Sequence, residues 1–151
     1  MKHKVIRIML AVIEAIVGLG AIGGGIAILT GAFDQWLPLA WLQGIPFSDY
    51  TIPGLILSIV IGGGMLVAAA TIFTQHEWAV LFSAAMGLVM IGFEVFEVAI
   101  IDRYADAIIP STIAQQALMS GLGLVIFGLA TYLWMSEYRQ HHFTTGPVSR
   151  A

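Results

Sequence analysis

The chain has 151 residues, of which 59% are hydrophobic and only 10% are charged. Soluble domains carry roughly 25% charged residues, so this chain cannot coat a water-soluble surface and is expected to be a single integral membrane domain. The formal net charge of -3 and the scattered basic residues predict no nucleic acid partner, and the absence of cysteine excludes disulfides, thiolate metal sites and cysteine nucleophiles.

Four apolar stretches are each long enough to cross a bilayer, because a spanning helix needs about 20 mostly apolar residues. In chain order we predict spans over about 5–30, 52–73, 78–101 and 111–135, followed by a polar tail over 136–151. The first stretch starts like a signal peptide, but it is too long for one and is interpreted as an uncleaved span. The expected fold is all-α, a transmembrane four-helix bundle of up-down-up-down topology with the lipid bilayer around it.

The basic residues orient this bundle. Only Arg103 lies in a loop on one face, and the other five lie at the two termini: Lys2, Lys4, Arg7, Arg139 and Arg150. The positive-inside rule then predicts a multi-pass protein of the cell membrane with both termini cytoplasmic. No basic side chain is expected inside a span.

The loop between the first two spans is unusually apolar. Trp36 and Trp41 within residues 31–42 favour the headgroup zone of a membrane. We expect this segment to lie on the bundle at the interface, and a lid over a substrate is the alternative.

The junction that follows carries a family resemblance. Residues 45–57 contain Pro46-Phe47-Ser48-Asp49-Tyr50 and then Ile52-Pro53-Gly54-Leu55. This pattern resembles the loop-to-helix junction of a group of small uncharacterised bacterial four-helix integral membrane proteins, and the likeness covers the first three spans. No activity is assigned to that group, so the resemblance implies architecture and no functional residue.

Carboxylates inside the spans are the main hint of chemistry, because a Glu in hydrocarbon is costly unless it is paired, protonated or functional. Glu14 lies near mid-membrane, roughly 14 Å from the inner end of its span. The same estimate of helical rise places one polar layer in the outer leaflet, and its members are Glu94, Glu97, Gln115, Gln116, Ser120 and Ser58.

This layer has two interpretations. In the first, the layer is a site open to the outside that binds a cation, a proton or a small polar solute. In the second, its side chains form hydrogen bonds between spans and hold the helices together. Glu14 is either a station on a proton path shared with Glu94 or the donor of one hydrogen bond to a neighbouring helix.

Glycines in the first two spans predict close helix packing, since small residues let backbones approach. The expected contact residues are Gly20, Gly23, Gly24, Gly25, Gly62, Gly63 and Gly64. The similar triplets at 23–25 and 62–64 also allow an inverted repeat, which is the weaker interpretation.

Several activities lack the residues that they need. No histidine or lysine lies within a predicted span, so a histidine-ligated haem and a retinal Schiff base are not expected. His76-Glu77 lacks the second histidine of a zinc motif. We therefore expect no metal, no cofactor and no enzymatic activity.

The favoured function is a structural or interaction subunit of a membrane assembly, as a homo-oligomer or with other membrane subunits. The alternative is a proton- or cation-linked transporter or channel that uses Glu94, Glu97 and Glu14. A weaker alternative is the binding of a lipid or another apolar ligand between the helices.

Overall fold

The computed structural model describes residues 2–35, 37–42, 47–104 and 110–139. Four helical segments are long and apolar enough to cross a membrane: His3–Leu29, Thr51–Thr74, Glu77–Ala99 and Ile113–Glu137. The predicted all-α class and four-span architecture are therefore confirmed. Of the residues considered above, Trp36, Ile45, Pro46 and Arg150 lie outside the described residues.

Each span is one helix except the second, which changes its helical form along its length. The first is α1 (Lys2–Leu29), the third is α4 (Glu77–Tyr104) and the fourth is α5 (Pro110–Glu137). The second span, Thr51–Thr74, joins α2 (Thr51–Leu55), a π-helix η2 (Ile56–Gly63), α3 (Gly64–Thr71) and a short 3₁₀ turn η3 (Ile72–Thr74). Wide π turns are often found at functional sites in helices.

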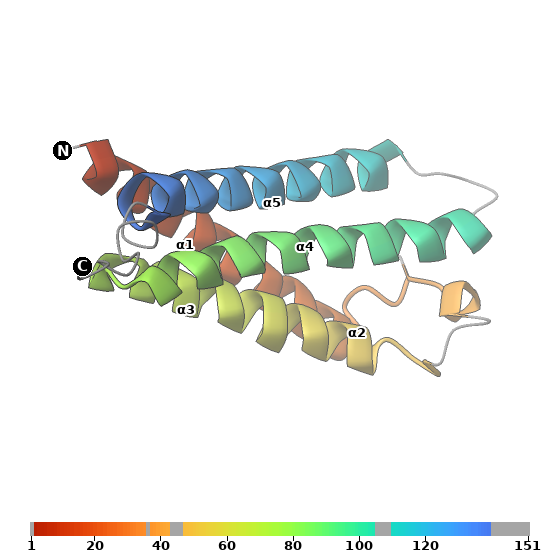
Figure 1. Ribbon diagram of the computed structural model, residues 1–151. Coiled ribbons are helices and arrows are strands. Elements are labelled where there is room, and N and C mark those ends of the chain that lie inside the picture. The colour runs from red at the N-terminus through yellow and green to blue at the C-terminus, as the bar shows by residue number, and fades with distance from the viewer. Residues whose placement is uncertain (1, 36, 43–46, 105–109, 140–151) are drawn as a thin grey trace, which may run out of the picture.

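The spans are arranged as two antiparallel hairpins. The first hairpin pairs α1 with the second span, and the other pairs α4 with α5 along most of their lengths (Figure 1). Among the described residues the backbones of α1 and α4 do not come close to each other, and neither do those of the second span and α5, so these two pairs lie on the diagonals of the bundle. Helix α1 begins and helix α5 ends at the same end of the bundle, which is called here the terminal end. The opposite end is called the loop end.

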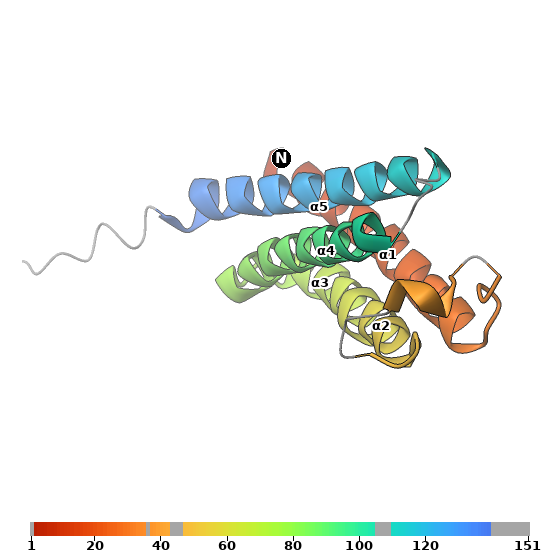
Figure 2. The ribbon, with the colours of Figure 1, turned by 90° about the vertical axis from the view of Figure 1, so that its right-hand side faces the viewer.

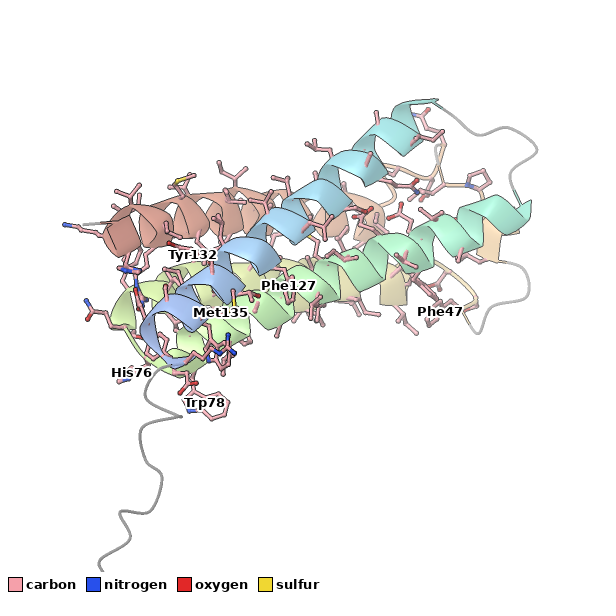
Figure 3. All side chains as sticks on the ribbon, turned by 45° about the horizontal axis from the view of Figure 1, so that its top comes forward. Phe47, His76, Trp78, Phe127, Tyr132 and Met135 are labelled. Carbon is pink, nitrogen blue, oxygen red and sulfur yellow. The ribbon has the colours of Figure 1, made fainter. Side chains whose placement is uncertain are left out.

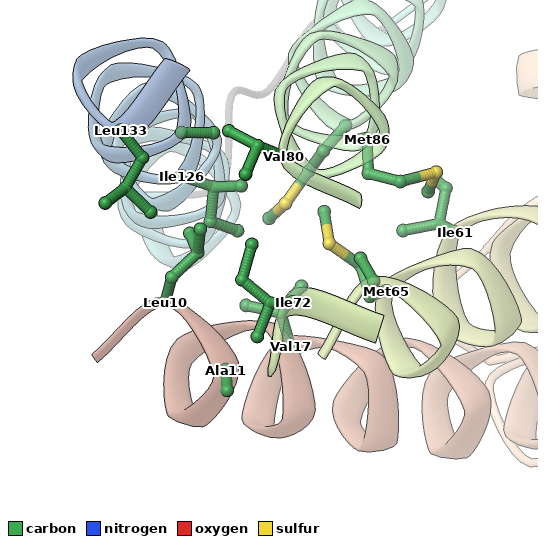
Figure 4. Close-up of a cluster of buried hydrophobic side chains, with 13 residues drawn as sticks. Leu10, Ala11, Val17, Ile61, Met65, Ile72, Val80, Met86, Ile126 and Leu133 are labelled. Carbon is green, nitrogen blue, oxygen red and sulfur yellow. The ribbon is translucent and has the colours of Figure 1, made fainter. Parts of the chain in front are cut away.

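The hydrophobic core lies where the two hairpins meet, in the half nearer the terminal end. All four spans contribute to it (Figure 4), and its members include Leu10, Val17, Met65, Ile72, Val80, Met86, Ile126 and Leu133. Towards the loop end α2 makes no contact with α4, and most side chains at 113–118 of α5 are exposed. The hairpins therefore pack closely at the terminal end and part towards the loop end (Figures 1 and 2).

The apolar segment after α1 packs on the loop end, as expected. Its short helix η1 (Leu39–Leu42) contacts α4 (Figure 2), and Leu42 is buried. The hydroxyl of Tyr50 donates to the carbonyl oxygen of Pro38 at 3.0 Å. The ring of Phe47 meets Phe96 of α4 edge to face, with 6.5 Å between the ring centroids.

The glycine contact between α1 and the second span differs from the predicted one. A Cβ atom on Gly25 would lie 2.6 Å from the carbonyl oxygen of Gly54, and one on Gly62 would lie 2.6 Å from Cγ1 of Ile22. These glycines bring the two backbones together because no side chain fits between them. Gly18, which was not among the predicted contact residues, faces Gly62 in the same contact.

The remaining predicted contact glycines lie elsewhere. A Cβ on Gly24 would meet only Leu57, at an ordinary 3.5 Å, and one on Gly64 would meet the flexible end of Met86 on α4. Gly20, Gly23 and Gly63 have open space where a Cβ would lie, so their assignment to the packing between these spans is corrected. The reason is the helical period, which turns Gly23 of one triplet and Gly63 of the other away from the neighbouring helix.

Candidate intramembrane polar site

The predicted outer layer can be located from the register of the helices. Gly87 of α4 packs against Gly123 of α5, since a Cβ on Gly87 would lie 2.8 Å from the Gly123 carbonyl oxygen. The helices are antiparallel, so two turns further towards the loop end the same register places Gln116 opposite Glu94. The contact of Gly64 with Met86 likewise brings Ser58 of the second span to about this level.

Burial within this layer is uneven. Glu94 is buried, with 7% of its surface exposed, whereas Glu97, Ser58, Ser120 and Gln116 are partly buried and Gln115 is exposed. Gln115 lies eleven residues before the buried Ile126, and this spacing places both on one face of α5. Gln115 is therefore exposed because the hairpins part at the loop end.

The hydrogen bonds of this layer do not join the spans. The hydroxyl of Ser58 donates to the carbonyl oxygen of Gly54, four residues earlier in its own helix, at 2.8 Å. The side-chain nitrogen of Gln116 is buried without a partner. Among the described residues, no hydrogen bond to another span is formed by the side chains of Glu94, Glu97, Gln115, Gln116, Ser120 or Ser58.

Glu97 lies one turn beyond Glu94 on α4, nearer the loop end, and the two carboxyl groups are close enough to interact. Tyr50, which precedes the second span, is also near Glu97. Burial raises the pKa of the Tyr50 phenol, and the Glu97 carboxylate adds to this effect. Tyr50 therefore keeps its proton, which it donates to the carbonyl oxygen of Pro38 in the loop segment.

Glu14 lies at a different place, in the centre of the bundle. Its carboxyl group and the hydroxyl of Ser83 on α4 are both fully buried and close enough to interact, although neither forms a hydrogen bond in the structure. Since α1 and α4 are diagonal partners, the two side chains meet across the middle of the bundle. Glu14 stands out in the sequence as a carboxylate inside a span, whereas Ser83 carries no such signal because it looks like any small residue of a span.

The two carboxylate sites are separate. Ser83 and Glu94 are eleven residues apart on α4, which is about 16 Å along a helix axis and nearly the same face. Met86 and Met90 lie between them and are buried in the core. Among the described residues, no polar side chain joins Glu14 to Glu94 along this face of α4.

A third buried polar group, Arg7, corrects the expectation that no basic side chain lies inside a span. Arg7 is 5% exposed and donates to the carbonyl oxygen of Ile72 and to the carboxylate of Glu137. It also lies 3.1 Å from the hydroxyl of Tyr138, which itself donates to the Gln75 carbonyl oxygen at 2.6 Å. These bonds tie the two hairpins together at the terminal end.

The burial of Arg7 has a signal in the sequence. Arg7 and Glu14 are seven residues apart and therefore share a face of α1 with Leu10 and Val17, which are core residues. Its partner was missed because α5 continues to Glu137, inside the stretch predicted to be a polar tail.

Aromatic side chains mark both ends of the bundle. Trp78 is 80% exposed and points outward from the bundle at the terminal end, beside His76, whereas Phe47 lies at the loop end (Figure 3). A hollow of about 540 Å³ at the terminal end is lined by His3, Lys4, Arg7, Phe73, Gln75 and Glu137. A more open and largely apolar groove lies between the second span and α4, from Val67 to Ala85.

The chemistry available to these sites is limited. Within the described part of the chain, no three His, Asp or Glu side chains gather closely enough to hold a metal ion. The loop-end layer offers two carboxylates, amide groups and hydroxyls, which suit a proton, a monovalent cation or a small polar solute. Glu14 with Ser83 offers one carboxyl group and one hydroxyl in a dry environment.

Comparison with known proteins adds no assignment. No protein-family model, no curated protein and no solved structure matches this chain. The resemblance at residues 45–57 therefore identifies no family, and what can be stated is a membrane protein with four candidate spans.

Proposed function

We propose that the protein binds a proton, a monovalent cation or a small polar solute at the loop-end layer, as part of proton- or cation-linked transport across the membrane. One observation carries this proposal: among the described residues, the polar side chains of the layer make no hydrogen bonds between spans. Side chains that served only to hold helices together would be bonded across them, because unsatisfied polar groups in hydrocarbon are costly.

The position of the layer supports the same function. Glu94 is buried between hairpins that part towards the loop end, and Gln115 is exposed in that opening. The short helix η1 packs on α4 at this same end of the bundle. By the positive-inside rule this end faces outward, so a solute would enter from outside the cell.

A paired measurement tests this proposal. Glu94→Gln with Glu97→Gln keeps the shape of protonated carboxyl groups but cannot ionise. We expect the double variant to remain folded in detergent and to lose the pH- or ion-dependent flux that wild type shows after reconstitution into liposomes. Asp49→Asn, an exposed carboxylate outside the spans, is the matched control and should keep wild-type flux.

The outcomes separate the alternatives. A wild-type protein without flux under any proton, sodium or potassium gradient contradicts transport. A reporter fused after Ala151 tests the orientation independently and should be active only when it is cytoplasmic; external activity would reverse the assignment of the two faces.

A second candidate function is that of a structural or interaction subunit, and the outward-facing glycines favour it. Gly20 and Gly23 of α1, and Gly121 and Gly128 of α5, have open space where a Cβ would lie. Each costs roughly 1 kcal/mol of helix stability relative to alanine, and no contact with the described part of the chain compensates for it. Packing against further helices, in a homo-oligomer or with other subunits, would use these faces.

Oligomeric state in a mild detergent tests this second function. Gly20→Leu with Gly23→Leu should disrupt any oligomer and leave the monomeric bundle intact. A wild-type protein that is monomeric alone and in its native membrane would contradict it.

A further inference from the structure

The Glu14–Ser83 pair is the most unusual feature of the interior. Both side chains are completely buried, come from opposite hairpins, and have polar atoms without hydrogen-bond partners. Buried polar atoms in native proteins nearly always have a partner, so an orphaned pair at the centre of a membrane bundle points to a ligand or a function.

The surroundings of the pair provide no counter-charge. At this level α3 presents Met65 and Ala68, α4 presents Val80, and α5 presents Ile126 and Ala130, all of which are buried and apolar. Among the described residues, no charged or titratable side chain faces Glu14 from α3, α4 or α5.

The charged groups along the same interior lie further away. Arg7 is seven residues closer to the terminal end on α1, about 10 Å along the axis, and is already bound to Glu137 and to the Ile72 carbonyl oxygen. Glu94 lies towards the loop end, beyond Met86 and Met90. Glu14 is therefore isolated from other charges.

We propose that Glu14 and Ser83 form a proton-binding site at the centre of the bundle, which holds the two hairpins together while the proton is bound. An isolated carboxylate in this apolar environment would be unpaired, whereas the neutral carboxyl group donates its O–H to Ser83 after a small side-chain rotation. When the proton leaves to bulk water, the charge must be hydrated, and water reaches it only if the hairpins separate. The site does not depend on the loop-end layer or on transport.

The stability of the bundle then depends on pH with a defined sign. The folded protein holds a proton on Glu14 that the unfolded chain releases, so folding binds protons and stability falls as pH rises. In the pH range where only the folded state holds this proton, the unfolding equilibrium constant rises up to about tenfold per pH unit.

Two sets of variants isolate this effect. The reference chain carries Glu94→Gln and Glu97→Gln, so Glu14 is the remaining carboxyl group in the middle of a span. Unfolding in detergent is measured from about pH 5 to about pH 9, over the range in which such a linkage operates. We expect the reference chain to lose stability with rising pH, and the same chain with Glu14→Gln to lose most of that slope and to be the more stable of the two at high pH.

An infrared measurement reports on the proton directly. The reference chain at neutral pH should show the C=O band of a protonated carboxylic acid, which Glu14→Gln removes. Ser83→Ala should shift the frequency of this band, because it removes the hydrogen-bond acceptor, whereas Ser120→Ala should not. Absence of the band in the reference chain overturns the proposal even if Glu14→Gln does not fold, and so does a pH slope that Glu14→Gln leaves unchanged.

Discussion

Neighbouring glycines in the second span provide a sharp test of the helix packing. Gly62 faces α1, where an added Cβ would lie 2.6 Å from Ile22 Cγ1, 2.9 Å from the Ile22 backbone nitrogen and 3.0 Å from the Gly18 carbonyl oxygen. Gly63 has no neighbouring atom within 4 Å of the same position. Alanine at position 62 should therefore force the hairpin open, and alanine at position 63 should be accommodated.

The magnitude follows from these distances. Carbon atoms in contact are about 3.5–4.0 Å apart, and the Ile22 nitrogen belongs to a backbone that cannot rotate away, so the helices must move apart by more than half an ångström. Overpacking of this kind costs roughly 1–3 kcal/mol. The gain of about 1 kcal/mol in helix propensity is common to both variants and cancels in their difference. Gly62→Ala should thus be about 1–3 kcal/mol less stable than Gly63→Ala.

The assay is equilibrium or thermal unfolding of the two variants in the same detergent, with oligomeric state measured on the same samples. Oligomeric state separates a loss of packing within the bundle from a loss of assembly at the outward face that carries Gly63. Equal stability of the two variants, or a less stable Gly63→Ala with unchanged assembly, would refute the register derived for α1 and the second span.

Two further predictions concern the ends of the bundle. Arg7→Gln should lower the free energy of unfolding by about 1.5–3 kcal/mol, the range for hydrogen bonds to charged groups, because Glu137 and the Ile72 carbonyl oxygen lose their donor. The control Lys4→Gln, at an exposed position, should change the free energy of unfolding little. Equal effects of the two variants would show that Arg7 contributes only general charge. Phe47→Ala should remove an aromatic contact worth roughly 0.5–1.5 kcal/mol between the loop segment and α4. Hydrogen exchange should then increase in residues 37–42 and stay unchanged in the core around Met65. Unchanged exchange in residues 37–42 would mean that the loop segment is held by other contacts.

The spans themselves could be predicted from the sequence because hydropathy acts locally. An apolar stretch of sufficient length forms a helix in a bilayer whatever its neighbours are, since its backbone polar groups must bond within the segment. Helical rise likewise gave the depth of Glu94, Gln116 and Ser58, and the structure brings these residues to about one level. Rise along one axis needs no knowledge of the other helices.

Side-chain partners could not be predicted in this way. Whether Gly62 or Gly63 faces α1 depends on a rotation of one residue, about 100°, and the glycine triplets look alike from every side. The meeting of Glu14 with Ser83 depends on which helices lie on the diagonal of the bundle, and that order is decided by packing among all four spans. Arg7 shows the same limit: hydropathy placed it at the end of a span, and only the continuation of α5 to Glu137 beside it made burial of its charge possible.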